Sequence, residues 1–141
     1  MAVTYLHLPS GAAPPPGQDL RPFRAMLVIE QEVTDAWREL VSHWLVHVGC
    51  FYMLAWGLGC GKWHDSVDWA NLEATNFEVS DDNLIMTTSH ESEPLAEAFW
   101  FAGFCAHHPI KPLDNTLIID ISGTERETAV LAAWEAAQRE I

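Results

Sequence analysis

The stretch Ala25-Met26-Leu27-Val28-Ile29 is a continuous apolar run, and it turns polar abruptly at Glu30-Gln31-Glu32. A run of this kind is typical of a strand buried on both faces. The segment that follows has helical periodicity: Thr34 can act as its N-cap, apolar residues recur at i, i+3, i+4 and i+7, and Gly49 ends it. The stretch therefore predicts a buried strand followed by an amphipathic helix.

The same alternation of an apolar run and a helical pattern recurs three more times along the chain. Further strands are expected at 51–55, 84–88 and 116–121. The helices that follow them are expected from Asp65 or Ser66 to Glu73, from Pro94 to His107, and after a capping box formed by Thr124 and Glu127. Alternation of this kind predicts an α/β fold, a three-layer αβα sandwich with a mainly parallel sheet of four strands.

The first 22 residues differ in composition from the rest of the chain. Residues 4–8 could form a fifth, N-terminal edge strand, and they lead into a Pro- and Gly-rich segment at 11–17. We therefore expect an N-terminal arm over residues 1–22 and one α/β domain over residues 23–141.

The charge of the chain is strongly acidic, with a formal net charge of −13. No Lys or Arg occurs between Lys62 and Lys111, whereas nine Asp and Glu residues do. Phosphate backbones and anionic membranes are bound through clustered cations. We therefore expect neither a nucleic-acid nor a membrane partner, whereas basic proteins and metal cations stay open as partners.

The cysteines and the N-terminus bear on location. The three cysteines, Cys50, Cys60 and Cys105, show no disulfide framework, and no basic region followed by an apolar stretch opens the chain. No apolar run is long enough to cross a bilayer. A cytoplasmic location is the simplest interpretation.

Polar residues follow each predicted strand, at the edge where parallel sheets bind ligands. The exits of the strands at 51–55 and 84–88 carry the chemically capable groups. The catalytic candidates there are His90, Glu91, Asp65 and Cys60. The ligand-binding candidates are Trp56, Gly57, His64, Ser89 and Glu93. Trp63 or Trp69 could add an aromatic wall.

Four of these residues could bind a divalent metal: His64, Asp65, His90 and Glu91. Imidazole and carboxylate groups are suitable ligands for Zn²⁺ and similar ions, but the sequence spacing is not diagnostic. A structural interpretation is the alternative. Glu91 and Glu93 would complement the positive end of the third helix, and Asp65 would lie in the first turn of the second.

The glycine-rich segment from Gly57 to Gly61 precedes Lys62 and invites a phosphate-loop interpretation. The Walker spacing fails, because Trp56 occupies the position of the first Gly and Trp63 that of the Ser or Thr. The dinucleotide pattern fails as well. A flexible turn or a nest of backbone amides is the simpler interpretation.

Two strings, WHDSVDWANLE at residues 63–73 and MTTSHESEPL at residues 86–95, resemble those of small uncharacterised bacterial α/β proteins of unknown function. The resemblance extends over about residues 24–122. It implies no activity, and no functional residue is carried over from it.

Two functions follow as hypotheses. The first is a binding or regulatory accessory module that contacts a protein partner or forms a homo-oligomer, through the apolar helix at 94–107 or the Pro-rich arm. The second is a hydrolase or transferase with a His/carboxylate site, with or without a divalent metal, at the ends of the second and third predicted strands. Whether the chain is an enzyme stays open at this stage.

Overall fold

The computed structural model describes residues 2–16 and 20–139 of the chain. Within these residues the strands and helices follow one another in the order β1 (Ala2–His7), β2 (Phe23–Ile29), α1 (Asp35–Val48), β3 (Cys50–Gly57), α2 (Cys60–Ala74), β4 (Met86–His90), α3 (Leu95–Phe104), β5 (Asn115–Ile121) and α4 (Glu127–Gln138).

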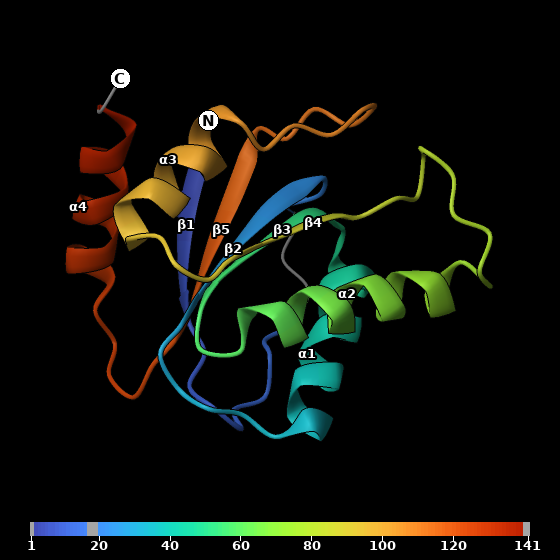
Figure 1. Ribbon diagram of the computed structural model, residues 1–141, viewed down its shortest axis with the longest axis horizontal. Coiled ribbons are helices and arrows are strands. Elements are labelled where there is room, and N and C mark those ends of the chain that lie inside the picture. The colour runs from blue at the N-terminus through green and yellow to red at the C-terminus, as the bar shows by residue number, and fades with distance from the viewer. Residues whose placement is uncertain (1, 17–19, 140–141) are drawn as a thin grey trace.

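The five strands form one sheet in the order β1-β5-β2-β3-β4, and every neighbouring pair is parallel. Strand β2 lies at the centre, with Met26 opposite Ile118 of β5 on one side and Leu54 of β3 on the other. The predicted α/β class with a parallel sheet is confirmed. The optional fifth strand is β1, which pairs with β5 at one edge (Figure 1).

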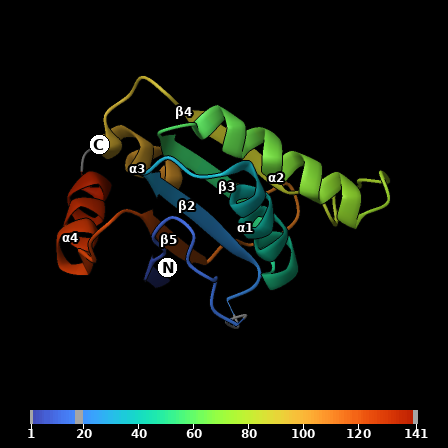
Figure 2. The same ribbon diagram turned by 90° about the horizontal axis from the view of Figure 1, so that it is seen from below.

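The helices lie in two pairs on opposite faces of the sheet (Figure 2). Side chains alternate along β2, so Leu27 packs with the core beneath α1 and α2, whereas Met26 packs with the core beneath α3 and α4. Because both faces are covered, every residue of β2 is buried. This explains the unbroken apolar run in the sequence.

Helix α1 follows the sequence pattern closely. The Thr34 hydroxyl accepts a hydrogen bond from the Trp37 amide at 3.2 Å, and Gly49 ends the helix in the left-handed conformation at φ +95°. Helix α4 departs from its predicted capping box. It begins at Glu127 with Arg126 at the N-cap and without a side-chain cap, so Thr124 is not the cap.

Helix α2 begins at Cys60, several residues before the predicted start at Asp65 or Ser66. Gly59 is its N-cap, at φ +64°. Because the helix starts earlier, its first turn contains no acidic residue, and the interpretation of Asp65 as a first-turn charge is wrong. Asp65 lies in the second turn instead.

The order in which successive strands are added to the sheet reverses beside β2. From β2 the chain moves through β3 to the edge strand β4, and it then returns to β5 on the other side of β2. In open parallel sheets the carboxyl ends of the strands, above all at such a reversal, are where ligands bind. No helix among the described residues is long and apolar enough to cross a membrane.

Candidate functional site

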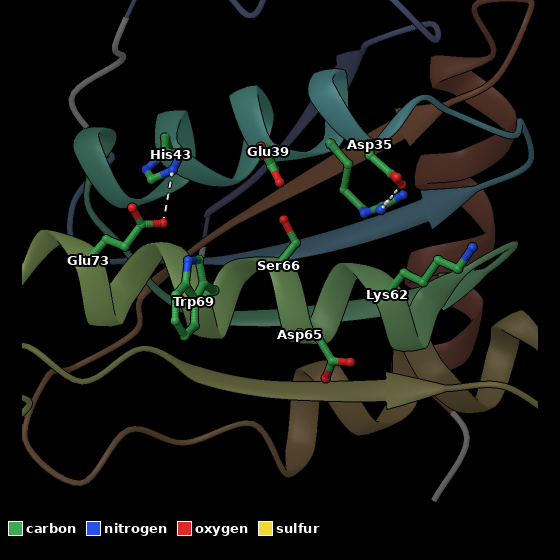
Figure 3. Close-up of a pocket in the computed structure, with 9 residues that line it drawn as sticks. Asp35, Glu39, His43, Lys62, Asp65, Ser66, Trp69 and Glu73 are labelled. Carbon is green, nitrogen blue, oxygen red and sulfur yellow. Dashed lines mark hydrogen bonds and ion pairs between the residues drawn. The ribbon is translucent and has the colours of Figure 1, made fainter. Parts of the chain in front are cut away.

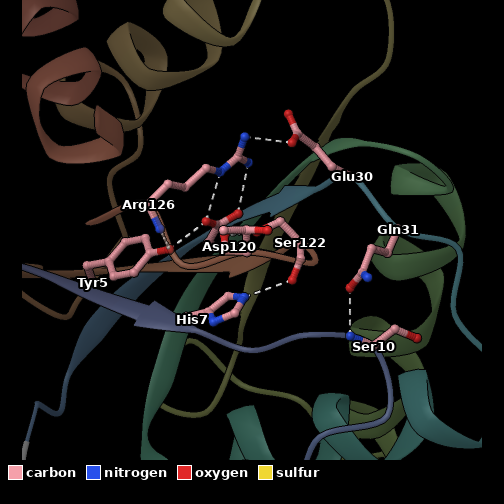
Figure 4. Close-up of polar contacts among 9 residues, drawn as sticks. Tyr5, His7, Ser10, Glu30, Gln31, Asp120, Ser122 and Arg126 are labelled. Atoms are coloured by element: carbon pink, nitrogen blue, oxygen red, sulfur yellow. Dashed lines mark hydrogen bonds and ion pairs between the residues drawn. The ribbon is translucent and has the colours of Figure 1, made fainter. Parts of the chain in front are cut away.

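The carboxyl ends of β2 and β5 are joined by a network of polar side chains (Figure 4). Asp120, fully buried at the end of β5, accepts hydrogen bonds from the Tyr5 hydroxyl at 2.6 Å and from Arg126 Nε at 3.0 Å. Arg126 also forms an ion pair with Glu30 at 2.7 Å. The guanidinium therefore links the ends of β2 and β5, the two strands between which the order of the sheet reverses.

The charges in this network stabilise one another. Burial alone would raise the pKa of Asp120, but hydrogen bonds from Arg126, Tyr5 and Ser122 outweigh that effect and hold this pKa below its ordinary value. The pKa of Arg126 is raised, chiefly by its hydrogen bonds to Asp120. The sequence predicts that Glu30 lies at a strand exit, but no pattern in it indicates that Arg126 and Asp120 would join Glu30 there.

A hollow of about 630 Å³ opens at the carboxyl ends of β3 and β4, beside the start of α2. Six of the residues predicted for catalysis or ligand binding line it: Gly57, Cys60, His64, Asp65, Ser89 and Glu91. We call this space the rim hollow. It gathers groups from two strand ends and one helix, as expected for adjacent parallel strands.

Imidazole and carboxylate groups interact along one side of the rim hollow. His64 Nδ1 lies 3.2 Å from Asp65 Oδ1 and 3.5 Å from Asp68 Oδ2. The second carboxylate is itself held, because the Thr87 hydroxyl of β4 donates a hydrogen bond to Asp68 Oδ1 at 2.6 Å. A His ring oriented by a carboxylate through one nitrogen can exchange a proton through the other.

Glycines shape the turn that leads into this hollow. Gly57 has φ +106°, and a Cβ atom there would lie 2.1 Å from the Ile29 carbonyl oxygen. A Cβ on Gly61 would lie 3.2 Å from Glu91 Oε1, so the carboxylate comes close to the first turn of α2. Glu91 therefore lies beside the positive end of α2, a contact that the structural interpretation of the sequence did not include.

Three predicted site residues lie elsewhere: His90, Glu93 and Trp56 are not among those that line the rim hollow. His90 is buried, its Nδ1 pairs with the Glu93 carboxylate, and its ring packs edge-on against Phe101 of α3 at 5.1 Å. Trp56 Nε1 donates to the Glu93 carbonyl at 2.8 Å. Strand β4 extends through His90, and successive side chains point to opposite faces, so His90 faces α3 while Ser89 and Thr87 face α2.

The four residues predicted as metal ligands separate into two groups. His64 lies beside Asp65, whereas His90 pairs with Glu93 away from Glu91. Across residues 2–16 and 20–139, no group of three or more His, Cys, Asp or Glu side chains is arranged to hold a metal ion.

A second concavity, the helix groove, runs between α1 and α2 with a volume of about 470 Å³ (Figure 3). Asp35, Arg38, Glu39 and His43 of α1 line it opposite Lys62, Asp65, Ser66, Trp69 and Glu73 of α2. Of the two candidate aromatic walls, Trp63 is buried against Trp37, whereas Trp69 is 57% exposed. No pattern in the sequence indicates that α1 packs beside α2, so this groove could not be predicted from it.

The fold and the sites define a small α/β protein with a parallel sheet, ligand-sized hollows at its strand ends, and an acidic helical face. The family model described as Domain of unknown function (DUF7684) matches residues 3–137, and the chain belongs to this family. The resemblance found in two internal strings is thereby confirmed over nearly the whole chain. No curated protein and no solved structure matches it.

Proposed function

We propose that the protein is a binding or regulatory accessory module that recognises a basic polypeptide through the helix groove. The observation that carries the proposal is the exposed indole of Trp69, set among carboxylates of α1 and α2. Two of the seven Trp side chains are exposed, and Trp69, at 57%, is more exposed than Trp100, at 37%.

The aromatic part of this surface extends beyond the groove. Trp69 packs edge-on against Phe77 with ring centroids 5.7 Å apart, and Phe77 is itself 60% exposed. Exposed aromatic side chains that contact one another are enriched at protein interfaces, where they become the main sources of binding energy. We call Trp69, Phe77 and the groove carboxylates Glu39, Asp65 and Glu73 the acidic aromatic face.

The charge of this surface favours a cationic partner, because four carboxylates line the helix groove against two cations, Arg38 and Lys62. From residue 63 to residue 110 the chain has no Lys or Arg, and Glu78, Asp81 and Asp82 follow Phe77 as exposed carboxylates. An Arg side chain can stack on an indole while its guanidinium donates to a carboxylate. Charge complementarity of this kind also steers association and makes it sensitive to salt.

The test is a calorimetric titration with an oligoarginine peptide at low and physiological salt. Trp69→Ala is expected to weaken binding about tenfold, because it removes the indole on which an Arg side chain of the peptide stacks. Trp100→Ala is the matched control, since Trp100 is an exposed indole on α3. Equal affinities for the two variants, or no binding by the wild-type protein, would show that the acidic aromatic face is not the recognition surface.

A second candidate function rests on the His64 network in the rim hollow. His64, oriented by Asp68 and accompanied by Ser89 and Glu91, is the arrangement for general acid–base chemistry in a hydrolase or transferase. The variant that tests it is His64→Ala, since His90 lies outside the hollow. Turnover of p-nitrophenyl acetate and p-nitrophenyl phosphate should fall in His64→Ala and persist in His43→Ala; unchanged turnover in both, or none in the wild type, rejects catalysis of these reactions by His64.

A cytoplasmic location belongs to the same proposal. Support comes from Cys50, Cys60 and Cys105, which are all free thiols. Proteins of oxidising compartments commonly pair their cysteines.

A further inference from the structure

A third hollow lies between the carboxyl ends of the adjacent strands β2 and β3, and it has a volume of about 330 Å³. Gln31 and Glu32 line it from the exit of β2, and Leu58 and Gly59 from the exit of β3. Val33, Arg38, Lys62 and Trp63 complete the lining. The volume falls within the range of small-molecule sites. We call this space the central hollow.

Two cations line the central hollow, in a chain that has 20 acidic residues and only seven Lys and Arg residues. The Arg38 side chain is 12% exposed, and its Nη2 donates to Asp35 at 2.5 Å. Its Nε is buried and has no hydrogen-bond partner within residues 2–16 and 20–139. A buried donor without an acceptor costs about 1–3 kcal/mol, so the guanidinium of Arg38 has hydrogen-bonding capacity that Asp35 does not use up.

Lys62 is the second cation, and it is exposed. In the described part of the chain it forms no ion pair, although carboxylates outnumber cations almost three to one. It belongs to the first turn of α2, whose N-cap Gly59 provides no side-chain hydrogen bond. The positive end of this 15-residue helix adds to the potential of the two cations.

We propose that the central hollow binds a phosphate group between Arg38 and Lys62. The Arg38 guanidinium donates to one phosphate oxygen, and the Lys62 ammonium balances the charge of the others. The apolar side chains of Val33 and Leu58 fit the carbon atoms of a small phosphate monoester. This site adds Arg38 to the glycine turn and Lys62. The spacing of residues in the sequence does not predict that Arg38 lies beside the turn.

Glu32 also lines the central hollow, and its sign is opposite to that of the two cations. Its carboxylate is exposed and repels a dianion only through solvent. The proposal therefore makes a paired prediction: removing the Lys62 charge weakens phosphate binding, and removing the Glu32 charge strengthens it.

The experiment is an NMR titration of the ¹⁵N-labelled protein with inorganic phosphate, glycerol phosphate and, at matched ionic strength, chloride. The amides of Gly59 and Lys62 should shift saturably with both phosphates and not with chloride. Lys62→Gln should weaken binding about tenfold, the loss of one charge-assisted contact. Glu32→Gln should strengthen it, and Lys111→Gln, which removes a cation on another surface, should leave it unchanged.

The outcomes separate the possibilities. Tighter binding of glycerol phosphate than of inorganic phosphate supports a monoester as the ligand, and equal binding supports the free ion. Unsaturable shifts, or an unchanged affinity in Lys62→Gln, would overturn the proposal. The basic-polypeptide proposal is tested separately, because Lys62→Gln should not weaken oligoarginine binding.

Discussion

Arg126 holds the fully buried carboxylate of Asp120 through two hydrogen bonds, from Nε at 3.0 Å and from Nη2 at 2.9 Å. Arg126 also pairs with Glu30 at the end of β2. A single side chain from the start of α4 thus joins the central strand to its neighbour β5, and it does so at the reversal of the chain, where many parallel sheets bind a ligand.

Arg126→Gln is expected to lower the free energy of unfolding by about 3 kcal/mol at pH 7, because it leaves a buried charge without its partner. The folded pKa of Asp120 lies below its unfolded value, so this stabilisation is complete above the unfolded pKa of about 3.9 and is lost as the pH falls through the folded pKa. Urea denaturation at pH 7, 5 and 3 measures it. The difference between wild type and variant should shrink at pH 3. The exposed Arg139→Gln is the control; a loss as large there would contradict the assignment.

The hydroxyl of Tyr5 should ionise at a higher pH than that of an unfolded tyrosine. Burial, followed by its hydrogen bond to Asp120, raises the pKa of Tyr5 to about 12. An unfolded Tyr ionises near pH 10, so stability should fall as the pH rises between about 10 and 12. Tyr5→Phe should remove this part of the pH dependence and cost about 1 kcal/mol at neutral pH. Ultraviolet absorbance titration gives the ionisation directly, and a Tyr5 signal near pH 10 in the native protein would refute the prediction.

Gly57→Ala should destabilise the protein by more than about 2 kcal/mol. The new Cβ would meet the Ile29 carbonyl oxygen at 2.1 Å, and φ is +106°. Gly11→Ala is the control, since φ there is +86° but no atom lies within 4 Å of the new Cβ. Strain without a clash should cost only about 1 kcal/mol. Thermal denaturation compares the two, and equal losses would mean that the contact with Ile29 relaxes freely.

One thiol of the three should react rapidly with Ellman's reagent in the native protein. Cys105 is exposed, whereas Cys50 and Cys60 are buried. Burial also raises the pKa of Cys50 to about 12, which suppresses its thiolate. Cys105→Ser should abolish the fast reaction, and all three thiols should react in denaturant. Fast modification of a second thiol in the native state would show that the core around it opens.

Local patterns predicted the elements whose stability is local. Thr34, the apolar stripe and Gly49 together specify α1, and the structure places its cap and its end at those residues. The start of α2 was missed. Its N-cap is Gly59, a residue type that offers no side-chain cap to recognise, and the turn before it depends on the close approach of Gly57 to Ile29, which is distant in the sequence.

The candidate site was predicted in part for a similar reason. The exits of β3 and β4 were expected at one edge of the sheet, and the rim hollow brings together His64, Asp65, Ser89 and Glu91. His90 was misplaced because the strand was expected to end at residue 88 rather than at His90. Because β4 continues to His90, the side chains of residues 89 and 90 also point to opposite faces of the sheet.

The sequence by itself determined the α/β class, the parallel sheet and the acidic charge, because hydrophobic periodicity and composition are properties of short segments. Only the tertiary structure decided the strand order, the ion pair of Arg126 with Glu30, and the placement of Arg38 and Lys62 around one hollow. These depend on which strands pair and which helices share a face, and such contacts join residues too distant in the chain for any local pattern to encode.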